Sequence, residues 1–265
     1  MLHPLQKDHF AVLQRFNELR NFPLIHAVCL QQQSGFIFVD QQVEPTVVFV
    51  TNKAGFSYLY VKDGIAIDHN ALLDFLAASK DVCQYIHIYE PPAITDLLSA
   101  MQAEQYGYKL RDRMQLKFRQ ASVSIPVANI PVTNEEISKE NIHEIRAMGF
   151  DAINLFWGSE EHFLSGGYGI LLKNEAGKPI CICYSACVAD KVAEVDIYTV
   201  PEYQNKGLAK YATALFVNRG ISKGIIPNWD CFEDNVPSLK TAMNIGFEVT
   251  RKYKYLSVYF KLKTI

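Results

Sequence analysis

The segment Val200–Lys210 has the residue types and the spacing to hold an anion. It joins a strand that a proline ends to an amphipathic helix, and Gly207 and Ala209 stand at the start of that helix. The first N–H groups of a helix lack partners within the helix, and the helix dipole adds partial positive charge, so the backbone alone can hold a pyrophosphate there. Gly207 lets the backbone approach closely, and Lys206 and Lys210 can add charge-assisted contacts. An ordinary strand-to-helix turn is the alternative.

The pattern Q-x-x-G-x-A over residues 204–209 resembles the acyl-coenzyme A loop of the GNAT superfamily of acyltransferases. Residues 193–197 resemble the fourth strand of that superfamily, and Asn235 with Gly246-Phe247 resembles its later N-to-GF segment. The amino-acid sequences of these motifs are similar to those of the zwittermicin A resistance type of GNAT domain. The resemblance covers about residues 155–250.

This resemblance implies that the fourth and fifth strands splay apart and that the pantetheine arm lies between them, with the thioester and an oxyanion-binding N–H near Val200. Acetyl-CoA is the implied cosubstrate, and no metal is expected. The residues implied in coenzyme binding are Tyr198, Thr199, Val200, Gln204, Asn205, Lys206, Gly207, Leu208, Ala209, Lys210, Asn235 and Ser238.

Acetyl transfer to an amine requires a base, because an alkylamine is mostly protonated at neutral pH. Glu194 is the first candidate, since it occupies the strand position where the superfamily often keeps a catalytic glutamate. Asp196 is the second candidate and would lie on the same face of a regular strand. The alternative for both is a half-exposed strand carboxylate with no catalytic role.

The general acid that protonates the departing thiolate is harder to assign. Many relatives place a tyrosine seven residues after the asparagine, and Ala242 stands there in this chain. Ser238, Tyr253 and solvent are the candidates that remain. An acyl-cysteine route through Cys187 or Cys231 is disfavoured, because no histidine stands at a telling spacing.

The predicted function is N-acetylation of a primary amine of a small molecule by direct attack in a ternary complex, and the type of GNAT domain implies an amino-polyol antibiotic as acceptor. A non-catalytic acyl-CoA sensor or interaction module is the alternative, and a longer acyl donor stays open. Asp230, Glu233 and Asp234 near Trp229, together with Trp157 and Phe163 elsewhere in the chain, could line a pocket for a cationic amine; a solvated acidic loop is the alternative.

The elements that would position these residues follow from hydrophobic periodicity. In the second half we expect a helical segment over 140–148, an aromatic-rich segment with Phe156, three strands at 168–173, 179–188 and 192–200, a helix over 208–220 that Gly220 ends, a strand over 225–231, a helix over 237–244 and a final strand pair over 247–262.

In the first half, four apolar runs over residues 24–62 predict an antiparallel meander. A helix is expected from Asp68, with Leu72, Phe75, Leu76 and Ser79 on one stripe, then a strand over 85–89, a helix after Pro91-Pro92 and a strand over 109–118.

The predicted fold class is α+β. A C-terminal GNAT (acyl-CoA N-acyltransferase) fold over 123–265, with a mixed, mostly antiparallel sheet flanked by helices, follows a second α/β module over 1–122. The strand, proline-led helix and Gly-aromatic strand after Tyr85 recur in the same order after Asn228, so the first module is a candidate degenerate GNAT-like repeat, although any α+β module can produce such a pattern. It lacks a coenzyme loop.

The composition is that of an ordinary packed protein. The 265 residues include 26 basic and 28 acidic side chains, for a net charge of −2, so no global positive field favours nucleic acid or an anionic membrane as partner. The six cysteines, expected to be reduced, lack paired C-x-x-C spacing, and Cys181 and Cys183 are expected in a core. A cytoplasmic location is expected, and the oligomeric state stays open.

Overall fold

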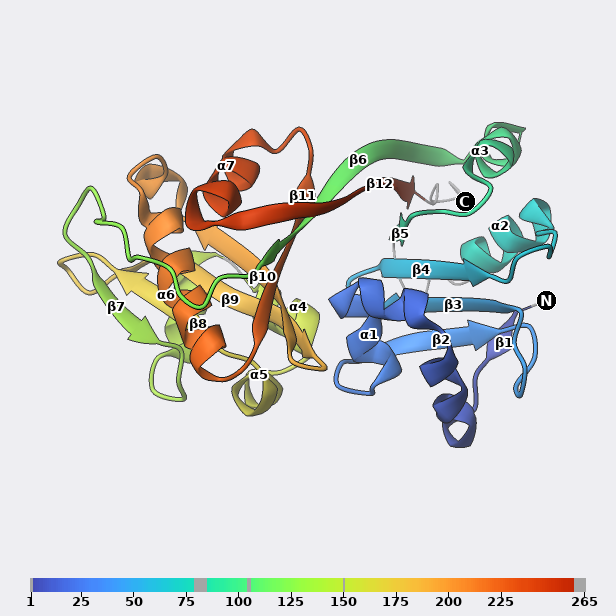
Figure 1. The fold of residues 1–265 in the computed structure, drawn as a ribbon, viewed down its shortest axis with the longest axis horizontal. Helices are drawn as coiled ribbons and strands as arrows, with labels where there is room; N and C mark the ends of the chain where they lie inside the picture. The colour runs from blue at the N-terminus through green and yellow to red at the C-terminus, as the bar shows by residue number, and fades with distance from the viewer. Residues whose placement is uncertain (1, 79–84, 104–105, 150, 260–265) are drawn as a thin grey trace, which may run out of the picture. The chain divides into compact units, whose positions relative to one another are not determined.

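The computed structural model describes residues 2–78, 85–103, 106–149 and 151–259, which form two compact units (Figure 1). Unit 1 consists of Met1–Asp112 and Tyr253–Ile265, and unit 2 consists of Arg113–Lys252. The expected boundary between residues 122 and 123 therefore lies inside unit 2. Among the described residues, no helix combines the length and the apolar character needed to cross a membrane.

Unit 2 is built on a mixed sheet in the order β6-β11-β10-β9-β8-β7. All neighbouring pairs are antiparallel except β10 and β11, which run parallel. Strand β7 was not predicted, and the other four strands match the predicted ones closely. The strands are β7 (Thr133–Glu136), β8 (Gly169–Lys173), β9 (Pro179–Ala189), β10 (Val192–Thr199) and β11 (Ile226–Phe232), with β6 described below.

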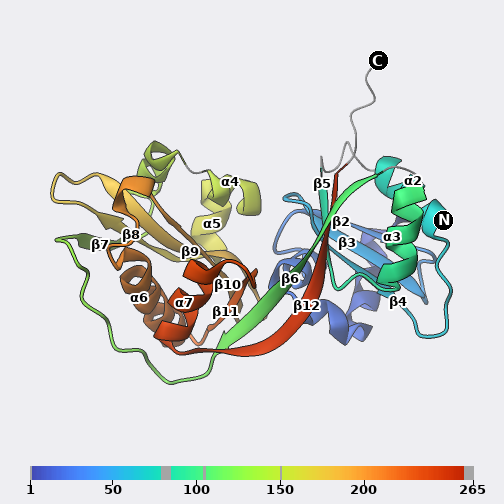
Figure 2. The same cartoon turned by 90° about the horizontal axis from the view of Figure 1, so that it is seen from above.

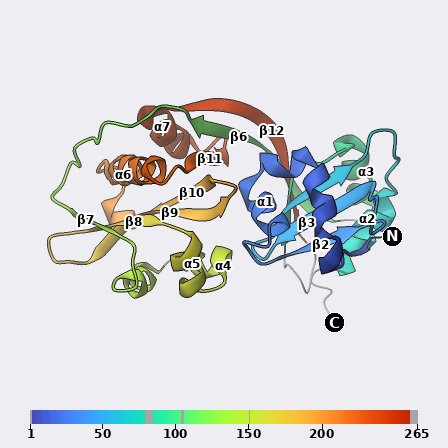
Figure 3. The same ribbon diagram turned by 60° about the horizontal axis from the view of Figure 1, so that its bottom comes forward.

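Helices cover both faces of the unit 2 sheet (Figure 3). One face packs on α6 and α7 through a core that includes Leu208, Ala212 and Phe216. The other face packs on shorter helices through Trp157 and Phe163. The elements are η4 (Ile142–Met148), α4 (Ala152–Trp157) and α5 (Glu160–Gly166) on one side, and α6 (Leu208–Ser222) and α7 (Val236–Ile245) on the other, with the short turn η5 (Pro201–Tyr203) before α6.

Gly220 does not end helix α6 as predicted, because the helix continues to Ser222. A Cβ at Gly220 would lie 2.4 Å from the hydroxyl oxygen of Tyr168, whose ring stacks on Phe216 with centroids 4.4 Å apart. This glycine therefore serves close packing between the helix and the sheet. Gly224 follows the helix with a φ of +69°, the left-handed conformation that often ends a helix. The helix-ending glycine is therefore Gly224 and not Gly220.

Unit 1 repeats the same plan with a meander, a helix, a parallel strand, a second helix and a long strand. Its sheet order is β1-β2-β3-β4-β5-β12-β6, with β4 and β5 parallel. The predicted helix after Asp68 is confirmed, since the Asp68 carboxylate accepts the N–H of Ala71 at 3.0 Å; Ser79 lies outside the described residues. The elements are β1 (His3–Pro4), η1 (Lys7–Arg15), η2 (Asn17–Asn21), α1 (Pro23–Cys29), β2 (Gly35–Val39), β3 (Val47–Asn52), β4 (Phe56–Val61), α2 (His69–Ala78), β5 (Tyr85–Tyr89), α3 (Ile94–Ala103), β6 (Gly107–Phe118) and β12 (Phe247–Tyr259).

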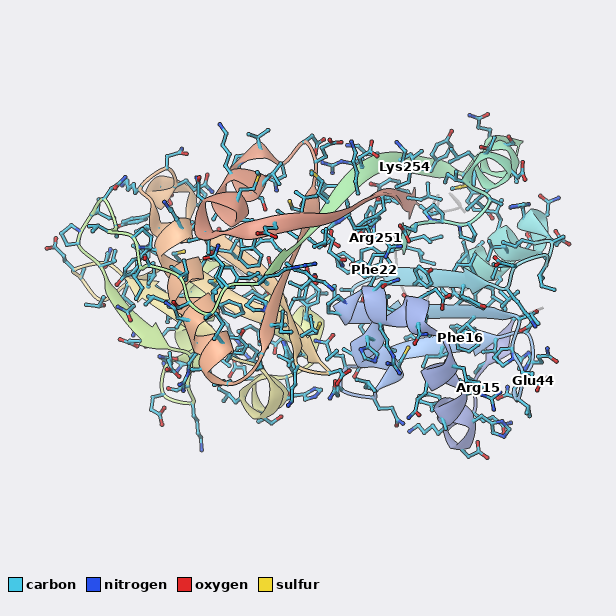
Figure 4. All side chains as sticks on the ribbon, in the orientation of Figure 1. Arg15, Phe16, Phe22, Glu44, Arg251 and Lys254 are labelled. Atoms are coloured by element: carbon cyan, nitrogen blue, oxygen red, sulfur yellow. The ribbon has the colours of Figure 1, made fainter. Side chains whose placement is uncertain are left out.

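The first run of the predicted meander is wrong, because residues 23–29 form helix α1 instead of a strand. Pro23 occupies the first turn, where a missing N–H costs nothing, and the run is buried on nearly every side, so its sequence shows no helical period. Phe22, labelled in Figure 4, precedes the helix and stacks on Tyr89 with centroids 4.3 Å apart. This aromatic contact anchors α1 to the strands of unit 1.

Two long strands, β6 and β12, connect the units, and each begins in one unit and pairs with a strand of the other (Figure 2). Strand β6 begins in unit 1, and its residues Arg113–Lys117, which belong to unit 2, pair with β11. Strand β12 begins in unit 2, and its residues Tyr255–Tyr259, which belong to unit 1, pair with β5. The final strand pair expected over 247–262 is thus one continuous strand up to Tyr259, the last described residue. Residues 247–259 contain no glycine, proline, asparagine or aspartate that could form a turn, and this explains why the strand is continuous.

We expect Gly220→Ala to lower the free energy of unfolding by about 1–3 kcal/mol, because the added methyl group meets the Tyr168 hydroxyl in a filled core. Among the described residues this hydroxyl has no hydrogen-bond partner, so Tyr168→Phe alone should cost little. Urea unfolding measures both effects. The double variant should recover most of the loss, and a double variant as unstable as Gly220→Ala would contradict this packing.

Candidate active site

The parallel pairing between β10 and β11 stops after three residue pairs. Val192, Ala193 and Glu194 pair with Ile226, Pro227 and Asn228, and the register of β10 against β9 shifts between Glu194 and Val195. Beyond this point β10 stays paired with β9 alone, so the edge of β10 that faces β11 is open. The two strands splay, as the resemblance implied.

A cavity of about 830 Å³ lies where the two strands separate. It lies wholly within unit 2 and reaches from the splayed strands to the N-terminus of α6. Its lining includes most of the predicted coenzyme residues and one predicted base, whereas Glu194, Tyr198, Val200 and Lys206 do not line it. The lining residues are Arg113, Val195, Asp196, Ile197, Thr199, Tyr203, Gln204, Asn205, Gly207, Leu208, Ala209, Lys210, Trp229, Asp230, Cys231, Phe232, Asn235, Pro237, Ser238 and Thr241.

The backbone of β10 presents alternate N–H groups to this opening. The N–H of Val200 donates to the carbonyl oxygen of Ile180 at 3.0 Å and is therefore directed to β9. Because N–H directions alternate along an antiparallel strand, the N–H groups of Ile197 and Thr199 are directed to the β11 side. The N–H of Ile197 also donates to the Asp196 carboxylate at 2.8 Å, which leaves Thr199 as the better-placed donor. Val200 itself is not that donor.

The loop before α6 has a backbone suited to an anion. Asn205 and Gly207 both have positive φ values, 61° and 75°, and no side chain caps the N-terminus of the fifteen-residue helix. The first N–H groups of α6 thus line the cavity without an internal competitor. Lys210 lines the cavity as well, whereas the Lys206 ammonium lies 4.8 Å from the centre of the Tyr203 ring. Lys206 therefore packs on the loop.

Glu194 is buried at the point where the two strands part. Its carboxylate accepts a hydrogen bond of 2.6 Å from the side-chain amide of Asn228, the residue opposite it on β11. Burial, reinforced by the nearby negative charge of Asp230, raises the pKa of Glu194 well above its ordinary value, although the Asn228 bond and Arg113 oppose this. A carboxyl with a raised pKa is better matched to accept a proton near neutral pH.

Asp196 lies two residues further along β10 and lines the cavity. The hydroxyl of Tyr184 donates to its carboxylate at 2.6 Å, and the Ile197 N–H donates to the other oxygen. Burial raises the pKa of Asp196, and these two hydrogen bonds hold it lower than burial alone would. Each carboxylate oxygen of Asp196 thus already accepts one hydrogen bond within the protein.

Arg113 is a site residue that the sequence did not single out. Its Nε donates to the Asp230 carboxylate at 2.6 Å, its Nη2 donates to the Asp230 carbonyl oxygen at 2.8 Å, and its guanidinium lies 4.6 Å from the centre of the Phe232 ring. Only 10% and 4% of the two side chains are exposed. No local motif marks Arg113, because the register of β6 against β11 brings it there.

Helix α7 supplies the other predicted residues. The Asn235 side-chain oxygen caps the helix by accepting the N–H of Ser238 at 3.3 Å, and the Ser238 hydroxyl accepts the indole N–H of Trp229 at 3.1 Å. Both residues line the cavity. Ala242 is fully buried in the core on α7. Tyr253, the other candidate acid, is buried in unit 1 against Tyr89 and does not line the cavity.

The acidic, aromatic pocket that was one of the two alternatives for these residues is not formed. Asp230 is paired with Arg113, and the Glu233 carboxylate pairs with Lys252 at 2.7 Å. Trp157 and Phe163 are buried in the core on the other side of the sheet. A cationic amine would therefore not meet these residues as one surface.

The cysteines pack as small apolar side chains. Cys181 and Cys183 are buried in the core under α6, as predicted, and five cysteines are free thiols; Cys83 lies outside the described residues. Burial raises the pKa of the Cys187 thiol and of the Cys231 thiol, although Cys231 lines the cavity. Both are thus poor nucleophiles near neutral pH.

Comparison with known proteins agrees with this geometry. A model of the family described as GNAT acetyltransferase matches residues 16–256. The chain belongs to this family. The match extends over both units, beyond the residues that carry the loop motif. A curated relative, the "Uncharacterized N-acetyltransferase YdfB" of Bacillus subtilis (strain 168), is 22% identical over 263 residues, which are 96% of this chain and 97% of the relative.

Solved structures show that the fold is GNAT-like. The crystal structure of a GCN5-related N-acetyltransferase-like protein from Streptococcus suis 89/1591 matches with a TM-score of 0.71 and 18% identity, over 95% of this chain and 98% of that chain. A tandem GNAT protein from the clavulanic acid biosynthesis pathway matches with a TM-score of 0.61 and 12% identity, over 99% of each chain. The match to the tandem GNAT structure supports the two-module arrangement.

The burial of Glu194 predicts a stability effect that grows with pH. Because its pKa is raised in the folded state, the carboxyl stabilises the fold below its unfolded pKa, and this contribution is lost as pH rises through the folded pKa. Each unit by which the pKa is raised costs about 1.4 kcal/mol at high pH. Glu194→Gln keeps an oxygen for Asn228 and avoids this cost.

Unfolding temperatures of Glu194→Gln and wild type should therefore diverge in favour of the variant between pH 5 and pH 8. Glu175→Gln, at an exposed turn position, is the matched control and should show no such trend. A variant that loses stability relative to wild type as pH rises would contradict the burial of an ionisable carboxyl here.

Proposed function

We propose that the protein transfers an acetyl group from acetyl-CoA to a primary amine of a small molecule, by direct attack in a ternary complex. The observation that carries this proposal is the early end of the β10–β11 pairing, which opens a cavity between parallel strands next to an uncapped helix N-terminus. Family membership supports an acyl-CoA ligand for this cavity.

The residues present fit acetyl-CoA. The N–H groups of Leu208, Ala209 and Lys210, with the glycine at 207, would hold the pyrophosphate, and Lys210 would add charge. The open edge of β10 from Val195 to Thr199 would bind the pantetheine arm as an added strand binds a sheet edge. Bound acetyl-CoA supplies the activated acyl group.

Glu194 is the proposed general base. It lies behind the opening at the last β10–β11 pair, so it would accept the proton of the acceptor ammonium through water. Asp196 faces the cavity but is held by Tyr184, so we assign it to the shaping of the acceptor side. The N–H of Thr199 is the proposed donor to the developing oxyanion.

Protonation of the departing thiolate falls to solvent or to Ser238, whose hydroxyl lines the cavity. Ala242 cannot donate this proton, because alanine has no hydroxyl and the residue is buried in the core.

The lack of a tyrosine at position 242 also favours the second candidate function, an acyl-CoA sensor without turnover. Turnover with any amine would exclude the sensor. Amino-polyols belong in the first set of acceptors, because the loop motifs resemble the zwittermicin A resistance type.

Gly207→Glu should abolish stabilisation by acetyl-CoA, because the side chain would add a repelling charge at the phosphate position and strain a φ of 75°. With acetyl-CoA at about 100 times its dissociation constant, the wild-type protein should gain about 2.7 kcal/mol of stability, seen as a higher unfolding temperature. Gly177→Glu is the matched control, since it has the same φ in the exposed β8–β9 turn. Equal shifts in both variants would contradict the assignment of the loop.

Glu194→Gln should lower turnover by about 10²-fold or more and leave acetyl-CoA affinity nearly unchanged, because it removes the base and keeps the hydrogen bond to Asn228. Release of free thiol with an accepted amine measures turnover, and calorimetry measures affinity. The acidic limb of the wild-type pH profile should report a group whose pKa lies above that of an ordinary glutamate. Unchanged turnover in the variant would remove Glu194 from this role.

A further inference from the structure

The first half of the chain contributes a charged side chain to the cavity of unit 2. Strand β6 follows α3 of unit 1 and then pairs with β11, which places Arg113 opposite Phe232 and Gln115 opposite Asp230. Arg113 lines the cavity, although the family motifs all lie in the second half of the chain. The strand that pairs with β11 at this edge is therefore β6, which begins in unit 1.

We propose that Arg113 is a positioning residue of the candidate active site, which binds and neutralises Asp230 beside the candidate base Glu194. This inference rests on the proposed function of that site. The contacts of the guanidinium include the Asp230 carboxylate at 2.6 Å, the Asp230 carbonyl oxygen at 2.8 Å and the face of Phe232. Such a fork needs arginine, since lysine offers a point charge and no planar pair of donors.

The geometry links this ion pair to Glu194 through one face of β11. Asn228 and Asp230 are two residues apart, so their side chains lie on the same side of the strand. Asn228 holds Glu194, and Arg113 holds Asp230. The negative charge of Asp230 raises the pKa of Glu194, and the positive charge of Arg113 lowers it. Arg113 is thus the cation that compensates Asp230 beside Glu194.

Other titratable groups near Glu194 come from different strands. Cys187 lies opposite it on β9, and Asp196 follows it on β10. The thiol has a raised pKa and carries no charge near neutral pH. Asp196 and Asp230 are negative when ionised, and the cationic Lys117 of β6 stands opposite Asn228 in the sheet. Arg113 is the cation that lowers the pKa of Glu194. Its removal should therefore raise the proton affinity of Glu194.

The test measures the titration of the Glu194 carboxyl in the full chain by carbon NMR of protein labelled at the glutamate side-chain carboxyl. The signal is assigned by its loss in Glu194→Gln. Arg113→Met should raise the midpoint by about one pH unit, a tenfold change in proton affinity, and the acidic limb of turnover should move in the same direction. Arg113→Met/Asp230→Asn should return the midpoint close to wild type, and Arg113→Lys should shift it less than Arg113→Met.

Asp230→Asn keeps the inference testable if Arg113→Met does not fold, because loss of the negative charge should lower the Glu194 midpoint. An unmoved midpoint in the folded single variants would overturn the inference. A tenfold or greater loss of acetyl-CoA affinity in Arg113→Met, again with an unmoved midpoint, would overturn it in favour of coenzyme binding by Arg113. Wild-type turnover in Glu194→Gln would instead remove Glu194 from the proposed role of base, and the NMR midpoint is read without turnover, so the two failures are separate.

Discussion

The early end of the parallel pairing between β10 and β11 is the constraint on which the site depends. Parallel strands that stay paired leave no room between them, whereas here the last pair is Glu194 with Asn228 and the cavity begins just beyond it. The separation of the strands leaves the edge of β10 unpaired, and the cavity along this edge reaches the N-terminus of α6. Glu194 is buried at the last pair, where the separation begins. The ligand site and the candidate base are thus both placed by the end of the strand pairing.

The two long strands give the fold its second organising feature. Each half of the chain builds its own meander, helices and parallel strand, and then contributes the end of its last strand to the sheet of the other unit. The sheet of each unit therefore includes part of a strand that begins in the other unit. The lack of a coenzyme loop in the first half therefore does not make that half dispensable, because it supplies the strand that borders β11 and carries Arg113.

The sequence predicted features that depend on local chemistry. The loop at 204–209, the three strands of the unit 2 meander and the helix that begins at Leu208 each have a clear period or a motif, and the structure contains these elements where they were predicted. Helix α1 was mistaken for a strand because a short run buried on all sides has no period. The exchange of β6 and β12, the partner of Asp230 and the burial of Trp157 depend on long-range register, which no local pattern encodes.

Amide hydrogen exchange of the full chain, with and without excess acetyl-CoA, tests most directly whether the splayed strands form the coenzyme site. The account predicts slower exchange in peptides that cover Val195–Thr199 and Gly207–Lys210, because both segments would gain hydrogen bonds or cover. Strand β4 in unit 1, which precedes a helix without a coenzyme loop, should exchange at the same rate in both states. Unchanged exchange over residues 195–210, or protection confined to β4 and α2, would contradict the account.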